Sequence, residues 1–195
     1  MKVANLLFVL FAAVIGGGCE MSASVNPLYS PNAVTTRDEL VGTWAKQEDP
    51  HWKISTDERL EITKTGDKGV YGVSNVTGRD VIKTTFRIVE LGDSLYADVL
   101  TPPEMTGDRP PVHLFILVKI KGDYFGISPV DMQKLKARLK TDPLPIETYT
   151  GGCLILNGKT EALQRFFRDA GEALFSFDDN HEVFHRIKSE STKSD

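Results

Sequence analysis

The stretch Ile82–Val99, IKTTFRIVELGDSLYADV, shows most clearly which kind of fold the chain adopts. From residue 82 to residue 88, Ile, Thr, Phe and Ile alternate with Lys, Thr and Arg. This two-residue period places one set of side chains toward a core and the other toward solvent, which is typical of a half-buried strand. Gly92-Asp93-Ser94 then indicates a turn into a second strand at residues 95–99. The sequence therefore predicts two consecutive strands joined by a tight turn.

Similar signals recur along the chain. The segment 112–120 is apolar at nearly every position, so we expect both of its faces to be covered. About seven to nine short strands separated by turns favour an antiparallel barrel or a sandwich. The other expected strands lie near residues 60–62, 70–73, 124–127, 153–156 and 182–187.

Two helices are expected before the last strand. Ser128-Pro129 is typical of a helix N-cap followed by proline at the first helical position, and this helix would run to about residue 140. The second is expected over residues 160–174. We expect the pair to cover one end or one open edge of the sheet, so the predicted fold class is β-rich α+β. The apolar stripe of the second helix consists of Ala162, Leu163, Phe166, Phe167 and Ala170.

The N-terminus has the layout of an export signal. Lys2 precedes an unbroken apolar run over residues 6–15, which is shorter than the ~20 residues needed to span a bilayer. Residues 15–19, Ile-Gly-Gly-Gly-Cys, resemble the bacterial lipobox, although Gly16 stands where that motif prefers an aliphatic residue. The resemblance implies cleavage before Cys19, a diacylglyceryl group on that cysteine and attachment to a membrane of the cell envelope. Plain secretion with cleavage nearby is the alternative.

These features predict four segments: a signal peptide over residues 1–18, a lipidated tether over 19–34, one domain over 35–187 and a disordered tail over 188–195. The tether is rich in Ser, Asn and Pro and has no periodicity. A capping box from Thr36 to Glu39 would open the ordered domain. Glu20, in place of Asp after the cysteine, favours the outer membrane by resemblance to enterobacterial sorting rules.

The cysteine content agrees with export. Lipidation of Cys19 leaves Cys153 unpaired in a short apolar run that suits a buried strand, where a lone cysteine behaves as a small hydrophobe. Without lipidation, a disulfide between Cys19 and Cys153 is the rival interpretation. The formal net charge of −4 argues against nucleic acid as a partner, because phosphate binding requires a positive surface.

Gly42-Thr43-Trp44 resembles the Gly-x-Trp signature of the lipocalins and related calycin barrels. In that family the Trp plugs the base of the barrel and an Arg near the last strand stacks on it, so the resemblance assigns those places to Trp44 and Arg186. It also implies a pocket for a small apolar ligand. Two features depart from the family pattern: no Thr-Asp-Tyr motif is present, and the helices precede the last strand. Residues 40–44 also resemble small envelope lipoproteins with a Leu-x-Gly-Thr-Trp start.

His181-Glu182-Val183-Phe184-His185 matches H-E-x-x-H. In zincins this motif requires a helix, which brings both histidines to one zinc ion while the glutamate activates water. Here the segment is better interpreted as a closing strand, and a third ligand could come only from His51 or His113. We therefore expect the match to be a coincidence and His113 to be structural.

Two functions are compatible with these features. The first is a non-catalytic, lipid-anchored binding or structural module of the cell envelope, with no cofactor and with a small apolar ligand or another envelope protein as partner. The second is a zinc-dependent hydrolase that uses His181, Glu182 and His185. A weaker third possibility is an inhibitor or assembly factor for another envelope protein.

Overall fold

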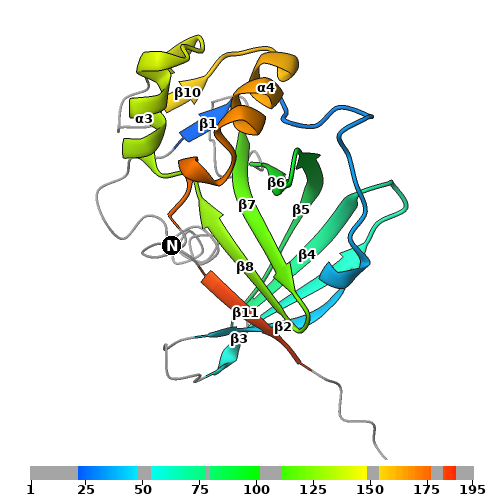
Figure 1. The fold of residues 1–195 in the computed structure, drawn as a ribbon. Helices are drawn as coiled ribbons and strands as arrows, with labels where there is room; N and C mark the ends of the chain where they lie inside the picture. Colours follow the sequence, from blue (N-terminus) through cyan, green and yellow to red (C-terminus); the bar gives the residue numbers. More distant parts are fainter. Residues whose placement is uncertain are drawn as a thin grey trace, which may run out of the picture.

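The computed structural model describes residues 22–47, 54–77, 80–101, 111–148, 154–176 and 182–187. Within these residues, eight antiparallel strands form a closed barrel of the lipocalin-like kind (Figure 1). The order is β6-β5-β4-β3-β2-β11-β8-β7, and pairing of β6 with β7 closes the circle. The antiparallel barrel predicted from strand spacing is confirmed, and the sandwich is excluded by this closure. The barrel strands are β2 (Gly42–Gln47), β3 (Ile54–Lys64), β4 (Val70–Thr77), β5 (Asp80–Leu91), β6 (Ser94–Leu100), β7 (His113–Lys121), β8 (Tyr124–Pro129) and β11 (Glu182–Arg186).

Tight hairpins connect the neighbouring strands at one end of the barrel. The turn between β5 and β6 contains Gly92 at φ 62°, and the turn between β7 and β8 contains Gly122 at φ 59°. Both values lie in the left-handed region, which glycine adopts without steric cost. The first hairpin is the one predicted from Ile82–Val99, and its register pairs Phe86 with Val99.

Side chains that alternate along each strand point into the barrel or away from it. The barrel has two ends, which differ in the elements that lie there. We call the end where β2 begins and β11 finishes the closed end, because the 3-10 helix η1 (Asp38–Leu40) packs there and buries Leu40 in the barrel core. The opposite end, where β2 finishes and β7 and β11 begin, we call the open end. The core between them contains large side chains, among them Trp44, Leu60, Ile62, Tyr71, Ile88, Phe125 and Phe184.

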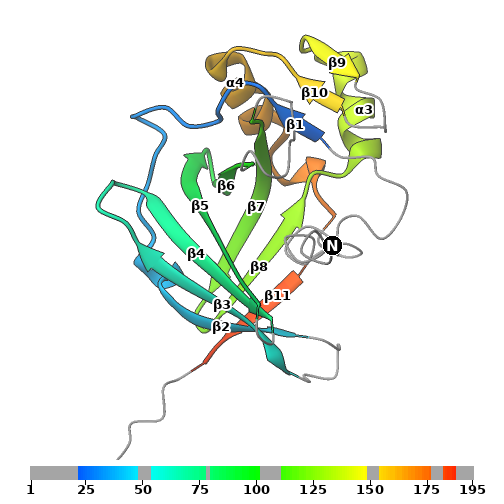
Figure 2. The ribbon, with the colours of Figure 1, turned by 180° about the vertical axis from the view of Figure 1, so that it is seen from behind.

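A second apolar core lies outside the barrel, between the outer face of β5–β7 and the helices. Figures 1 and 2 show the helices together on one side of the barrel. On β7, Leu114 and Val118 belong to the barrel core, whereas Phe115 and Leu117 belong to this second core. Both faces of the strand are therefore covered, as its apolar sequence predicts. The elements of this layer are β1 (Ser22–Ser24), α3 (Met132–Thr141), β9 (Ile146–Thr148), β10 (Leu154–Leu156), α4 (Thr160–Ala170) and the 3-10 helix η2 (Gly171–Leu174).

The sheet continues beyond the barrel through β1. Ser24 pairs with His113 at the start of β7, and β1 pairs in parallel with β10, which in turn pairs with β9. The structure corrects the predicted tether over residues 22–34, because this segment contains β1 and a fully buried Leu28. Its polar composition suggested a linker, but backbone pairing and specific hydrogen bonds hold it on the domain.

Two predicted helix starts are also wrong. No side-chain cap opens η1: its N-cap is Arg37, whose N–H donates to the Tyr71 hydroxyl at 2.6 Å, so the capping box of Thr36 is not used. Helix α3 begins at Met132, where the carboxylate of Asp131 accepts the first free amides. Ser128 and Pro129 instead complete β8, where they pair with Leu117 and Ile116 of β7.

Residues 1–21, with the predicted signal peptide and Cys19, lie outside the described residues, as do Cys153, His181 and the tail 188–195. Within the described residues, no helix is long and apolar enough to cross a membrane.

Candidate functional site

The closed end brings together Trp44, Arg186 and Gly42. Trp44 is fully buried, donates its indole N–H to the Leu40 carbonyl at 2.9 Å and meets the edge of Phe125. The guanidinium carbon of Arg186 lies 4.2 Å from the centre of the Trp44 ring. This is a cation–π contact, and Arg186 also donates to the carbonyls of Val41, at 2.7 Å, and Glu39.

Gly42 permits this arrangement. Its φ is 147°, and a Cβ built on it would lie 2.5 Å from Nη1 of Arg186. Any side chain would therefore displace the guanidinium from its position over Trp44. Gly42, Trp44 and Arg186 thus form one plug at the closed end.

The open end differs, because its inner wall carries charges. Lys46 is two residues beyond Trp44 on β2, and Glu182 is two residues before Phe184 on β11, so both face the interior. Nζ of Lys46 lies 2.7 Å from Oε1 of Glu182, and their side chains are only 22% and 12% exposed. A charged pair inside a barrel costs desolvation energy that an apolar pair would not.

A small pocket surrounds the pair. Its volume is about 10 Å³, roughly the space of one water molecule. Apolar and polar groups share the wall of this water-sized space. The lining residues are Lys46, Glu58, Arg59, Leu60, Asn75, Glu182 and Phe184.

The carboxyl group of Glu182, at this end, has a pKa shifted from its ordinary value. Burial raises its pKa above the ordinary value, while the hydrogen bond and the charge of Lys46 lower it and the charge of Glu58 raises it. Burial dominates, so the carboxylate is held less firmly in its charged form than an exposed glutamate would be.

The H-E-x-x-H segment forms strand β11 from Glu182 onward, as predicted, and the helix that a zincin requires is absent there. Glu182 faces inward to Lys46, whereas His185 contacts Gln47 at 2.8 Å and the ring of Tyr124. His181 lies outside the described residues. Among the residues that the structure describes, no group of three His, Cys, Asp or Glu could hold a metal ion.

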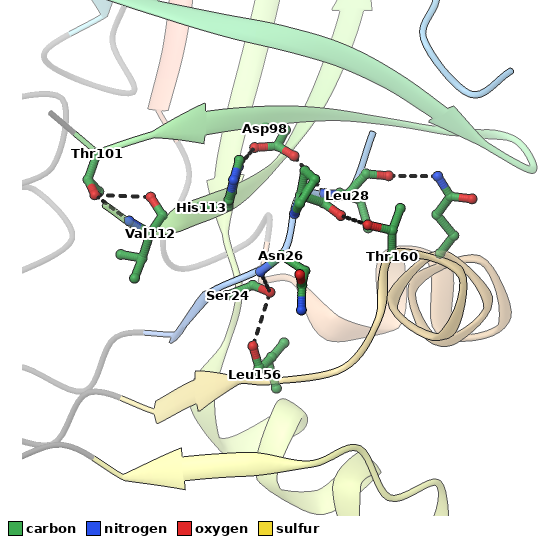
Figure 3. Close-up of polar contacts among 11 residues, drawn as sticks. Ser24, Asn26, Leu28, Asp98, Thr101, Val112, His113, Leu156 and Thr160 are labelled. Atoms are coloured by element: carbon green, nitrogen blue, oxygen red, sulfur yellow. Dashed lines mark hydrogen bonds and ion pairs between the residues drawn. The ribbon is translucent and has the colours of Figure 1, made fainter. Parts of the chain in front are cut away.

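The N-terminal segment is fastened to the barrel by a buried carboxylate (Figure 3). Asp98 on β6 is 3% exposed; one oxygen accepts the N–H of Leu28 at 2.6 Å and the other lies 2.6 Å from Nδ1 of His113. Because a carboxylate only accepts, Nδ1 is the donor. His113, predicted to be structural, thus shares the Asp98 carboxylate with the Leu28 amide.

The same segment is bonded to the helical layer on its other side (Figure 3). Ser24 donates to the carbonyl of Leu156 at 3.1 Å, and Thr160 donates to that of Pro27 at 2.9 Å. Gln164 donates to the Leu28 carbonyl at 2.8 Å. Residues 24–28 therefore join the barrel to α4 and β10.

Two groups were not predicted from the sequence. Lys46 continues the inward alternation from Trp44, so its place could have been deduced once Trp44 was put inside. Asp98 alternates with Leu95, Ala97 and Val99 and therefore looks solvent-facing. It is buried beside His113 and the amide of Leu28, and no local pattern indicates these long-range contacts.

The chain matches no family model, no curated protein and no solved structure.

Proposed function

We propose that this protein is a lipid-anchored, non-catalytic module of the bacterial cell envelope that binds a small amphipathic anion at the open end of its barrel. The observation that carries the binding role is the Lys46–Glu182 pair on the inner wall, beside the apolar side chains of Leu60 and Phe184. The export-like segment over residues 6–15 and the lipobox-like residues 15–19 support export and attachment to the cell envelope.

The ligand class follows from the chemistry of the pair. In the free protein Glu182 neutralises Lys46, and the pocket holds little more than a water molecule. An anionic head group can replace Glu182 as the partner of Lys46, whose flexible stem can turn toward it. Losing Lys46 would leave the Glu182 carboxylate buried without its cation, and because burial already raises the pKa of this group, it can take up a proton as the anion binds. The apolar part of the ligand would contact Leu60 and Phe184.

The closed end supports a relation to lipocalin-like barrels. Gly42, Trp44 and Arg186 lie together, which supports the resemblance, and the resemblance implies a small apolar ligand. We propose in addition that the ligand carries an anionic head group, which would pair with Lys46. The arrangement of Lys46 and Glu182 beside apolar side chains suits recognition of an amphipathic anion, which is why we propose binding without catalysis.

A fluorescence titration tests the binding role. A dansyl-labelled fatty acid is added to the mature chain carrying Cys19→Ser, which keeps it in solution, and to the same chain with Lys46→Gln or Glu182→Gln. Saturable binding that Lys46→Gln weakens several-fold and Glu182→Gln strengthens is expected. Lys119→Gln, which removes a charge from the exposed Lys119–Glu172 pair, is the matched control and should change nothing.

Absence of saturation in the unsubstituted chain would contradict ligand binding and leave a structural or protein-partner role. Saturation with equal affinity in the Lys46 and Glu182 variants would move the site away from this pair. Incorporation of radiolabelled palmitate into the unsubstituted chain, and not into Cys19→Ser, tests the anchor separately.

A further inference from the structure

We infer that the open end of the barrel faces the membrane to which the protein is attached, so that the bilayer surface itself is the partner of this end. The inference rests on the anchoring at Cys19 in the proposed function and adds the orientation of the barrel. It follows from the length of chain between the anchor and the fold, from the position of β1, and from the exposed apolar side chains.

The link between anchor and fold is short. Only Glu20 and Met21 separate Cys19 from Ser22, the first residue of β1. An extended chain spans at most about 3.3–3.6 Å per residue, so Cα of Ser22 lies within roughly 10 Å of Cα of Cys19. A lipid on Cys19 therefore holds β1 at the membrane surface and leaves little freedom for the domain to move away.

Strand β1 is fixed at the rim of the open end. Ser24 pairs with His113, the first residue of β7, and β1 pairs along its length with β10. Ala23 is 2% exposed and belongs to the barrel core together with Val99 and Leu114. The bonds from Leu28 to Asp98 and from Thr160 to Pro27 continue this attachment, so β1 cannot serve as a loose tether.

Exposed apolar side chains gather at the same end. In one row of paired residues, Leu100 on β6 is linked through His113, Ser24 and Leu156 to Ile146 on β9. Leu100 and Ile146, at the two ends of this row, are 45% and 48% exposed. Val25, which follows Ser24, and Val81, at the start of β5, are also exposed. We call Val25, Val81, Leu100 and Ile146 the apolar rim.

The apolar rim suits a lipid surface. Scattered exposed apolar residues are ordinary on a soluble protein. Of the six exposed large apolar side chains among the described residues, these four lie at the end nearest Cys19, whereas Tyr124 and Ile187 lie at the closed end. Apolar side chains near the acyl boundary add to the binding supplied by a lipid chain. The Lys46–Glu182 pair lies at the same end, so an amphipathic anion could pass between bilayer and barrel without crossing bulk water.

Depth-dependent quenching tests the orientation in the full lipoprotein. The lipidated chain, with Cys153→Ala, is reconstituted in phosphatidylethanolamine–phosphatidylglycerol vesicles that contain a nitroxide-labelled phospholipid. A single fluorophore is attached at Leu100→Cys or Ile146→Cys on the apolar rim, or at Lys68→Cys or Tyr124→Cys at the closed end. Circular dichroism establishes that each variant is folded.

Several-fold stronger quenching at residues 100 and 146 than at residues 68 and 124 is expected. Equal quenching at both ends, or stronger quenching at the closed end, overturns the orientation even though the protein is anchored. An intact mass without the lipid shows instead that the anchoring proposal has failed, and the orientation falls with it. The mass and the quenching thus separate the two failures.

Discussion

Replacing Lys46 with methionine is the sharpest test of the charged inner wall. Methionine keeps most of the lysine stem but removes the charge, so the Glu182 carboxylate loses its partner 2.7 Å away and remains only 12% exposed. Replacing Glu182 with methionine makes the opposite change. The double variant puts two apolar side chains beside Leu60 and Phe184.

The magnitudes follow from burial. Breaking a fully buried pair by removing one partner costs about 3–5 kcal/mol, and this pair retains some exposure, so we expect Lys46→Met to lower the free energy of unfolding by about 2–4 kcal/mol at about pH 8. Glu182→Met should cost less, about 1–2 kcal/mol, because the long lysine stem can carry its ammonium group toward solvent. The double variant should lie within about 1 kcal/mol of the parent, since an apolar pair needs no partner.

The pH dependence has a definite sign. Burial raises the pKa of Glu182 in the folded protein above its unfolded value, so the folded state binds the proton more tightly and gains relative stability as pH falls. Lys46 opposes that rise, and removing it moves the folded pKa further up. The cost of Lys46→Met should therefore shrink as pH falls through the folded pKa of Glu182 toward the unfolded value of about 4.3.

Urea unfolding of the four proteins, followed by fluorescence at about pH 8 and about pH 5, gives the double-mutant cycle. A coupling energy near zero, or a Lys46→Met cost that grows as pH falls, would refute the account of this pair. Lys119→Gln is again the control, because its exposed pair should contribute at most about 1 kcal/mol.

Three further variants test the closed end and the N-terminal segment. Gly42→Ala should lower the free energy of unfolding by about 1–3 kcal/mol, because it strains a φ of 147° and pushes a Cβ against Arg186. Gly66→Ala is its control, because a Cβ at residue 66 has nothing within 4 Å. Equal thermal midpoints of the two variants would contradict the plug. Arg186→Met should cost about 2–4 kcal/mol through loss of the cation–π contact and two carbonyl partners, and Trp44 fluorescence should change on substitution. Asp98→Ala leaves the Leu28 amide and His113 without their acceptor, at a cost of about 1–3 kcal/mol for each. Hydrogen exchange at residues 24–28 should then accelerate. Unchanged exchange there would show that Asp98 does not hold this segment on the barrel.

The sequence predicted the barrel well because its signals are local. Alternation and turn glycines define strands such as β5 and β6, and short antiparallel connections leave few ways to arrange them. The apolar run over 112–120 also indicated, correctly, that β7 is covered on both faces.

The N-terminal segment could not be predicted in the same way. Residues 22–34 look like a linker because their ordered state depends on partners far along the chain, such as Asp98 and Leu156. The charged inner wall was missed for a related reason: Lys46 and Glu182 are 136 positions apart and meet only when β11 pairs with β2. Contacts between residues so far apart in the chain cannot be predicted from local composition.

The intact mass of the mature protein, purified from the membranes of its host, shows whether residue 19 is the N-terminus and carries a lipid. We expect a chain that begins at residue 19 and carries the added mass of a diacylglyceryl group. An unmodified Cys19, or a chain cut at another residue, would contradict the lipid anchor and the membrane-facing barrel together.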